Sequence, residues 1–377
     1  MGAMFMKGNT SHIDNRKNRW LQLIICITVS LSFYTYIRFK IINRLNGNNV
    51  ETFTRRTNTG ITHAEENITD YQFPPFLRIN GKVNCRKIIE GDEKEIAKAN
   101  KYVKFNQPKR ITEEEYIAKT NDCNNFFNSF GYDAYPVTEE EREFPLAFSL
   151  LTFKDVDQTE RLLRSIYRPQ NFYCIHIDKS SSEVLHNALR KIANCLSNVF
   201  IVSKTEDVIY SHVSRLRADI NCMTDLLSKS NKWKYFINLP HQQFPLKTNL
   251  EIVKILKIYN GANDIEGTTT RHLLPDRFKY SYKYINNTLK RTGLKKGKLP
   301  YNANIVKGSA YGIFSREFVQ YVVYDEKAKA VFRYMEDFLS PDEYFWATLN
   351  HNEVLKAPER FTGERISIVV VLRSDFQ

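Results

Sequence analysis

The chain has 377 residues and a formal net charge of +13, with 42% hydrophobic and 13% aromatic residues. This composition is typical of a globular protein with one or two domains. A basic surface suits nucleic acid, anionic lipid or a phosphorylated small substrate. Nucleic-acid binding ranks low among these, because no zinc finger, arginine-rich run or RNA-binding signature accompanies the charge.

An uncharged, mostly apolar run of 18 residues occupies positions 20–37. Its length is at the short end for a membrane-spanning helix, and a cleaved signal peptide is the competing interpretation. Because no convincing small-residue cleavage site follows the run, we predict a transmembrane signal anchor, with residues 1–19 in the cytoplasm. Residues 38–143 are then a stem and an N-terminal lumenal segment, with a helical pattern near residues 113–119.

The sequons at Asn67 and Asn286 and the use of cysteine are compatible with a lumenal body. Asn-x-Thr triplets are usable glycosylation sites only in the secretory route. The six cysteines include no Cys-x-x-Cys pair, so structural zinc is not indicated. Four of the five cysteines beyond the anchor would allow three disulfide connectivities, and the spacing does not choose among them.

Apolar strands and amphipathic helices alternate from residue 144 onward. We expect buried strands at residues 146–153, 172–177, 199–202 and 235–239. Between them, Asp157-x-x-Glu160 and Thr248-x-x-Glu251 offer capping boxes that begin helices. This alternation predicts an α/β body over residues 144–377, with a mainly parallel sheet that is covered on both faces.

Ligands of such sheets bind beyond the carboxyl ends of the strands, and Asp178 comes at one such end. Asp178 is either a turn residue or an acceptor for a ribose or base, and Tyr210 is either a ligand contact or a packed aromatic. Asp155 and Asp157 have the Asp-x-Asp spacing that holds a metal on nucleotide diphosphates in many sugar transferases, but helix capping is the favoured role. The scattered histidines form no His-x-x-x-His pair, so no metal site is expected.

The stretch at residues 339–349 has the pattern of a helix start. Ser340 suits an N-cap, Pro341 suits the first helical position, and Glu343 would complete a capping box. A carboxylate on a rigid helix start is also a well-placed general base. Spacing alone favours the capping box. No glycine-rich phosphate loop or Gly-x-Ser-x-Gly elbow is present in the sequence, which argues against nucleoside triphosphatases and hydrolases.

Several stretches, all in one order, resemble the core-2/I-branching family of β-1,6-N-acetylglucosaminyltransferases. The matching stretches are residues 144–147, 161–178, 198–200, 218–223, 233–235, 244–249, 308–311 and 339–349. The resemblance implies a Rossmann-like, nucleotide-sugar transferase A-type fold in a single-pass type II Golgi membrane protein. It further implies inverting transfer of N-acetylglucosamine from UDP-GlcNAc to a 6-hydroxyl of a galactose- or GalNAc-type acceptor on the O-glycans of a glycoprotein, without a metal or other cofactor.

The resemblance also implies roles for individual residues. Glu343, in Ser-Pro-Asp-Glu, falls on the family's general base, which takes the acceptor proton as the hydroxyl attacks. Donor contacts fall on Leu151, Thr152, Phe153, Asp178, Lys179, Ser180 and Tyr210. Acceptor contacts fall on Glu266 and, by a weaker match, on Arg277. The family's cysteine pairs correspond to Cys123–Cys195 and Cys174–Cys222.

Two departures from the family pattern concern the phosphates. The family usually carries Cys-Gly-x-Asp before Phe-Pro, where this chain has Pro-His-Gln-Gln at residues 240–243. The family also continues beyond the helix of Glu343, and basic residues in that tail hold the diphosphate in place of a metal. Residues 366–372 do not resemble that tail, so this glycosyltransferase domain reads as C-terminally short, and Arg365 or Arg373 is a candidate substitute.

Two alternative functions follow from these departures and from the shared fold. One is a transferase-like protein without activity that binds glycans or a partner enzyme, because the leaving group would lack its usual counter-charges. The other is a relative of the peptide xylosyltransferases, which differ in sugar and acceptor.

Overall fold

The computed structural model describes residues 83–106, 109–269 and 273–358. The chain divides into two compact units, residues 1–70 and 71–377, and every described residue belongs to the second. The predicted signal anchor, the sequon at Asn67 and the arginines at 365 and 373 lie outside the described residues. Within the part of the chain that is described, no helix has both the length and the apolar character needed to cross a bilayer.

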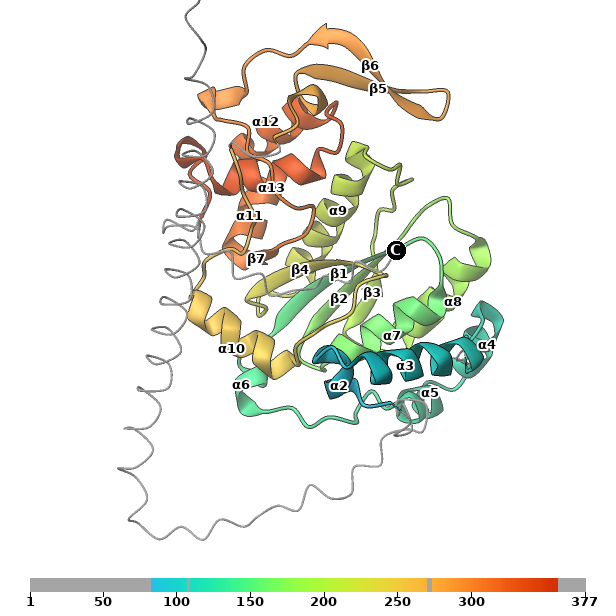
Figure 1. Ribbon diagram of the computed structural model, residues 1–377. Coiled ribbons are helices and arrows are strands. Elements are labelled where there is room, and N and C mark those ends of the chain that lie inside the picture. The colour runs from blue at the N-terminus through green and yellow to red at the C-terminus, as the bar shows by residue number, and fades with distance from the viewer. Residues whose placement is uncertain (1–82, 107–108, 270–272, 359–377) are drawn as a thin grey trace, which may run out of the picture. The chain divides into compact units, whose positions relative to one another are not determined.

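A five-stranded sheet, in the order β3-β2-β1-β4-β7, forms the centre of the body (Figure 1). Its strands are β1 (Leu146–Thr152), β2 (Phe172–Ile177), β3 (Val199–Ile201), β4 (Tyr235–Pro240) and β7 (Ile313–Ser315). The first four run parallel, and β7 pairs antiparallel with β4. The predicted strands and the mainly parallel sheet are confirmed, whereas the sequence pattern did not predict the antiparallel edge strand.

Strand β1 is buried along its whole length, and its alternate side chains enter two hydrophobic cores on opposite faces of the sheet. Phe148 and Leu150 pack in the first core with helices α7, α8 and α10, and Ala147 packs in the second with α9, α11, α12 and α13. The helices are α7 (Val156–Ile166), α8 (Glu183–Asn194), α9 (Val213–Lys229), α10 (Asn249–Tyr259), α11 (Arg316–Tyr324), α12 (Glu326–Met335) and α13 (Asp342–Asn350). The sheet is therefore covered on both faces, as a parallel sheet requires.

Two of the predicted capping boxes have different outcomes. The box of Thr248 and Glu251 is confirmed at the start of α10. The box of Asp157 and Glu160 is wrong, because Asp155 caps α7 and accepts a 3.0 Å hydrogen bond from the Gln158 amide. Both carboxylates are instead buried in the first core.

The partner of these two carboxylates is Tyr116, whose hydroxyl donates to Asp157 at 2.9 Å and to Glu160 at 3.1 Å. Tyr116 lies on α4, far from α7 in sequence, so a tertiary contact outcompetes the local cap. Glu160 also binds Arg164 at 2.9 Å. Burial raises the pKa of Glu160, and the Arg164 guanidinium opposes this rise.

Within the described residues, five helices precede the sheet. They are α2 (Cys85–Ile89), α3 (Glu93–Phe105), α4 (Glu113–Lys119), α5 (Cys123–Phe130) and α6 (Glu139–Arg142). Helices α4 and α5 contribute Tyr116, Phe126 and Phe130 to the first core. This part of the predicted lumenal segment is therefore packed onto the transferase-like body.

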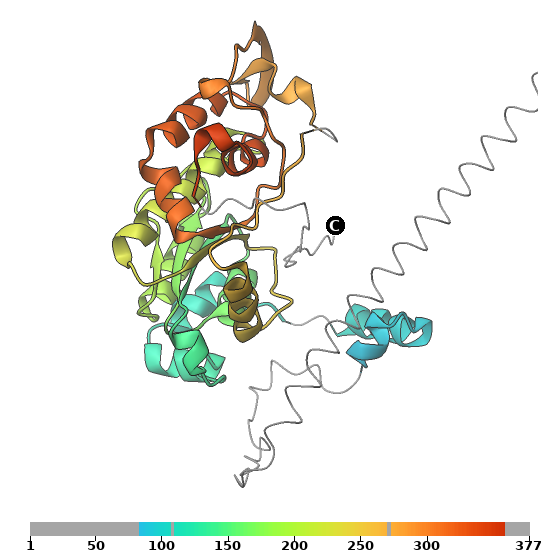
Figure 2. The same cartoon turned by 90° about the vertical axis from the view of Figure 1, so that its left-hand side faces the viewer.

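The remaining elements are short or lie at the edges. They are the hairpin of β5 (Tyr280–Ile285) and β6 (Thr288–Lys295) and the 3-10 turns η2 (Pro275–Arg277), η3 (Pro300–Asn302) and η4 (Glu353–Leu355). In both ribbon views the hairpin and the C-terminal helices, orange to red, lie at the opposite end of the body from the teal helices α4 and α5 (Figures 1 and 2).

Two disulfides, Cys123–Cys195 and Cys174–Cys222, join parts of the body, and they are the pairs that the family resemblance implies. Cys174 and Cys222 are fully buried and tie β2 to α9 across 48 residues of sequence. The exposed Cys85 is free.

Removing the buried disulfide tests how much it stabilises the fold. We expect the double variant Cys174→Ala/Cys222→Ala to lose up to about 4 kcal/mol of unfolding free energy, because the unfolded chain is no longer closed into a loop of this length and gains conformational entropy. Denaturant unfolding of the protein measures the loss. Cys85→Ala is the matched control and should leave the midpoint unchanged; an equally unchanged midpoint for the double variant would contradict the assignment.

Candidate active site

A cavity of about 650 Å³ opens at the carboxyl ends of β1, β2 and β4. The predicted donor residues that line it are Leu151, Thr152, Phe153, Asp178, Ser180 and Tyr210. The predicted base Glu343, at the start of α13, also lines the cavity. Lys179 points elsewhere, since it is exposed and does not line the cavity. The cavity lies where ligands of parallel sheets bind.

Asp178 has a structural role in the cavity wall. Its Oδ1 accepts hydrogen bonds from the Ser180 amide at 2.8 Å and from the Ser180 hydroxyl at 2.7 Å. Its Oδ2 accepts from the Val208 amide at 3.1 Å. The carboxylate therefore shapes the turn after β2 and joins it to the loop before Tyr210. Because the side chain also lines the cavity, the turn and ligand interpretations are compatible.

Two histidines of the cavity wall are buried. The Glu206 amide donates to Nε2 of His176 at 2.9 Å, which requires an unprotonated nitrogen there. Burial lowers the pKa of His176 despite nearby carboxylates, and burial also lowers the pKa of His241. Both side chains therefore favour the neutral form and add no positive charge to the cavity.

The capping-box interpretation of Glu343 is wrong. Ser340 has a left-handed backbone with a φ of 55°, and no side chain caps α13. The Ser340 amide instead donates to the Ser211 carbonyl at 2.7 Å, and Ser211 is also left-handed. This bond ties the loop of Tyr210 to the loop of Glu343. Two non-glycine residues held in a rarely populated conformation indicate a functional constraint on both loops.

The carboxylate of Glu343 is held through one oxygen. Its Oε2 accepts from Arg277 at 3.0 Å and forms an ion pair with the Lys307 ammonium at 2.8 Å. No residue that the structure describes donates a hydrogen bond to its Oε1. The side chain is 30% exposed and borders the cavity. Glu343 is thus an oriented carboxylate with one oxygen available to a ligand.

Lys307 was not predicted, and its own backbone explains its fixed position. Lys307 forms a two-way backbone bridge with Thr268, and the Gly308 amide donates to the Glu343 carbonyl at 2.7 Å. A Cβ at Gly308 would lie 2.1 Å from the Glu266 carbonyl oxygen, so only glycine fits this close approach. The segment of Glu266 is therefore packed beside Glu343, although Glu266 is exposed and does not line the cavity.

A buried polar cluster forms the floor of the cavity. Arg215 donates to Asp219 at 2.5 Å, and Asp219 also accepts from Ser149 and Asn238. Asp342 lines the cavity next to Arg215, and burial raises the pKa of Asp342 although the Arg215 guanidinium opposes the rise. Arg215 is thus balanced by neighbouring carboxylates, so the floor supplies hydrogen-bonding groups with little net positive charge.

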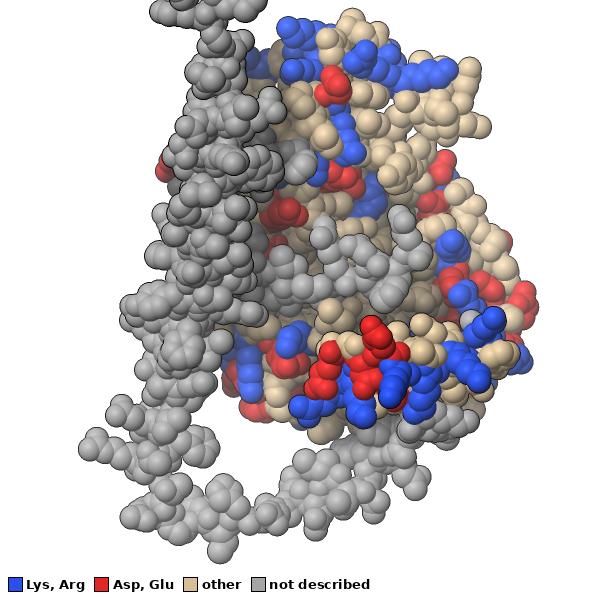
Figure 3. Space-filling model, in the orientation of Figure 1, with Lys and Arg blue, Asp and Glu red and all other residues tan. Residues whose placement is uncertain are grey.

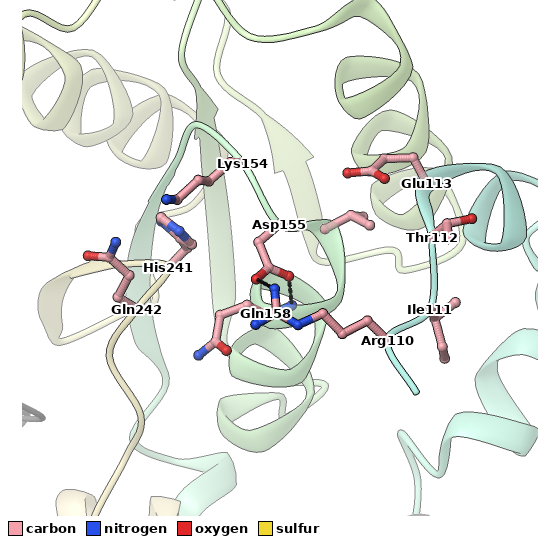
Figure 4. Close-up of a pocket in the computed structure, with 10 residues that line it drawn as sticks. Arg110, Ile111, Thr112, Glu113, Lys154, Asp155, Gln158, His241 and Gln242 are labelled. Carbon is pink, nitrogen blue, oxygen red and sulfur yellow. Dashed lines mark hydrogen bonds and ion pairs between the residues drawn. The ribbon is translucent and has the colours of Figure 1, made fainter. Parts of the chain in front are cut away.

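A second cavity, of about 600 Å³, shares His241 and Gln242 with the first. Arg110 crosses it to bind Asp155 at 2.6 Å, which leaves Lys154 as the cation beside the shared wall (Figure 4). Among the described residues no group of three or more His, Cys, Asp or Glu side chains could hold a metal ion. Asp155 and Asp157 are engaged by Arg110 and Arg161 instead.

The histidines predict a pH dependence of stability. Below pH 6.5 the unfolded chain protonates His176 while the folded chain, with its lowered pKa, does not, so stability falls as the pH falls. We expect His176→Gln, which keeps an acceptor for the Glu206 amide, to reduce this slope by at most about 1.4 kcal/mol per pH unit. Urea unfolding between pH 7 and pH 5 measures it, and an unaltered slope would contradict the burial argument.

Comparisons with known proteins bear on the family of the chain. A family model described as Core-2/I-Branching enzyme matches residues 146–367. The human protein named beta-1,3-galactosyl-O-glycosyl-glycoprotein beta-1,6-N-acetylglucosaminyltransferase is 43% identical over 71% of this chain and 63% of its own length. The bovine protein of the same name is 41% identical over 72% of this chain and 64% of its own length. The protein of that name from bovine herpesvirus 4 is 38% identical over 71% of this chain and 61% of its own length. The chain thus spans a little under two thirds of these relatives' lengths.

Among solved structures, a 4-diphosphocytidyl-2C-methyl-D-erythritol synthase from Anaerococcus prevotii is similar, with a TM-score of 0.26 and 12% identity over 49% of this chain and 77% of that one. This similarity is too low to support an argument about the fold.

Proposed function

Because the chain belongs to the Core-2/I-branching enzyme family, we propose that it is an inverting β-1,6-N-acetylglucosaminyltransferase with a nucleotide-sugar transferase A-type fold. UDP-GlcNAc is the donor, and a 6-hydroxyl of a galactose- or GalNAc-type sugar on the O-glycans of a glycoprotein is the acceptor. The names of the relatives support this substrate pair. The observation that carries the proposal is the carboxylate of Glu343, which is fixed through Oε2 and open at Oε1.

The chemistry assigned to Glu343 is general-base catalysis. The acceptor hydroxyl attacks the anomeric carbon, its proton moves to Oε1 of Glu343, and the bond from that carbon to the diphosphate oxygen breaks to release UDP. A single displacement of this kind inverts the anomeric centre. Arg277 and Lys307 hold the carboxylate in place before the proton moves. The family resemblance also assigns Arg277 to the acceptor. Arg277 would therefore contact the acceptor while it remains paired with Glu343.

The donor is assigned to the strand ends. The uridine part would lie against Asp178, Ser180 and Tyr210, where Tyr210 is 94% exposed and available for stacking. Glu343 lines the same cavity. The transferred sugar would lie near Glu343 and the polar residues Arg215 and Asp342, whose hydrogen-bonding groups suit sugar hydroxyls.

We propose that no metal assists the leaving group and that Lys154 supplies counter-charge to the diphosphate. Lys154 lies beside Phe153 and the wall shared by the two cavities (Figure 4). A cation near the phosphates stabilises the negative charge that develops on the leaving diphosphate, as a metal ion does in metal-dependent transferases.

We also propose a Golgi location for the lumenal body, with residues 20–37 as a type II anchor. Two disulfides support an oxidising compartment. The sequon at Asn286 supports it too, because Asn286 and Asn287 form the exposed turn of the β5–β6 hairpin.

Replacing the proposed base tests the mechanism. We expect Glu343→Gln to lower the rate of sugar transfer by about 10²–10⁴-fold, because the amide cannot take the acceptor proton. Radiolabelled transfer to a β-1,3-galactosyl-GalNAc disaccharide measures the rate. UDP affinity is the internal control and should stay the same; undiminished transfer would refute the role of Glu343.

The counter-charge has its own test, by calorimetry. We expect UDP to bind the parent protein equally well with magnesium and with a chelator. We expect Lys154→Met to weaken the binding of UDP about fivefold, as the loss of one exposed ion pair predicts. Uridine, which lacks phosphates, should bind the variant as it binds the parent protein. Lys254→Met, an exposed lysine on α10, is the matched control. Binding that depends on magnesium would contradict the proposal.

A further inference from the structure

The segment of residues 279–298, which contains the β5–β6 hairpin and its flanking residues, carries a charge equal to more than half of the formal net charge of the chain. Seven of the residues 279–298 are Lys or Arg and none is Asp or Glu, against a net charge of +13 for all 377 residues. Figure 3 shows Lys and Arg side chains gathered at this end of the face in view. The cations are Lys279, Lys283, Lys290, Arg291, Lys295, Lys296 and Lys298.

Few of these charges have partners in the fold. Lys296 forms an ion pair with Asp337, and Arg291 lies 3.9 Å from Asp276, a contact at the limit of an ion pair. The other five lysines are exposed and form no ion pair with any described residue. The hairpin therefore presents a field of unneutralised positive charge.

The register of the hairpin makes this charge costly. Lys283 pairs directly with Lys290 across the two strands. Like charges directly opposite each other destabilise a hairpin, and an isolated two-stranded hairpin is already marginal. A residue pair that destabilises the fold without an evident gain indicates a function. An anionic partner that lies over both ammonium groups would remove the repulsion between Lys283 and Lys290.

The position of the hairpin points to the acceptor side of the site. The Tyr282 hydroxyl donates to the Asp276 carbonyl, next to Arg277, and its amide donates to the Asp337 carbonyl. The ring of Tyr284 lies 6.4 Å from that of His212, which follows the cavity residues Tyr210 and Ser211. Strand β5 thus contacts Asp276, the neighbour of Arg277, and His212, the residue after the cavity residue Ser211.

We propose that the β5–β6 hairpin binds carboxylate groups of the acceptor glycoprotein next to the sugar that is modified. The carboxylates come either from Asp and Glu side chains of the acceptor polypeptide or from acidic sugars on a neighbouring glycan. The tyrosines alternate on one face of β5 and offer amphipathic contact area beside these charges. This inference rests on the proposed function and extends it from the acceptor sugar to the polypeptide that carries it.

The decisive variant is Lys283→Glu. It places a carboxylate directly opposite Lys290, so it should stabilise the hairpin while it weakens an anionic partner. We compare three acceptors that share the β-1,3-galactosyl-GalNAc disaccharide: the free disaccharide, a glycopeptide rich in Asp and Glu, and a neutral glycopeptide with a neighbouring sialylated sugar. Lys254→Glu on α10 is the matched control variant.

We expect Lys283→Glu to raise KM about fivefold for one or both acidic acceptors and to leave KM and kcat for the free disaccharide unchanged. The acidic acceptor that responds identifies the source of the carboxylates. The difference should vanish at about 0.5 M salt, because exposed charges are screened. The Lys254→Glu variant should match the parent protein throughout.

Three outcomes would overturn the inference. An equal loss for the free disaccharide would mean that the hairpin only shapes the cavity. Unchanged KM for both acidic acceptors would mean that it binds neither. Binding of the parent protein to phosphatidylserine vesicles, lost in the variant while every KM is unchanged, would assign the charge to a membrane surface. Absence of transfer to any acceptor would instead refute the proposed function itself.

Discussion

The site depends on one asymmetric interaction, in which two cations bind the same oxygen of Glu343. Arg277 and Lys307 come from segments far from α13 in sequence, and both reach Oε2. A carboxylate held this way keeps its direction without giving up its second oxygen. The close approach of Gly308 and the bond between Ser340 and Ser211 then fix the helix start relative to the loop of Tyr210. These restraints hold the side chain in the orientation that the proposed base requires.

The floor of the cavity and the β5–β6 hairpin differ in their net charge. The floor is nearly balanced, because carboxylates of Asp219 and Asp342 surround Arg215 and the wall histidines favour the neutral form. The hairpin at the acceptor side is strongly positive. A balanced floor suits the hydroxyls of a sugar, while unpaired lysines suit an anionic substrate. The net charge of the chain is thus explained by a local feature rather than by a uniformly basic surface.

The packing of α4 and α5 shows that the body extends upstream of the first strand. Tyr116 fills the first core and satisfies two buried carboxylates of α7, and the Cys123–Cys195 disulfide fastens the start of α5 to the end of α8. Arg161 and Arg164 pair with the same two carboxylates, and the Tyr116 hydroxyl adds a hydrogen bond to each. The first core of the body therefore includes this segment as well as the sheet.

The sequence by itself determined the parallel strands, most of their helices and the stretch that contains Glu343, because period, apolar runs and turn residues are local signals. It did not determine which interaction each acidic side chain makes. Glu160 and Glu343 both fit capping boxes by spacing, yet Tyr116 and Arg164 engage the first, and Arg277 and Lys307 engage the second. Only the tertiary structure decided between these roles, because Tyr116, Arg277 and Lys307 come from distant segments, and a buried or paired carboxylate gains more from such partners than from a local cap.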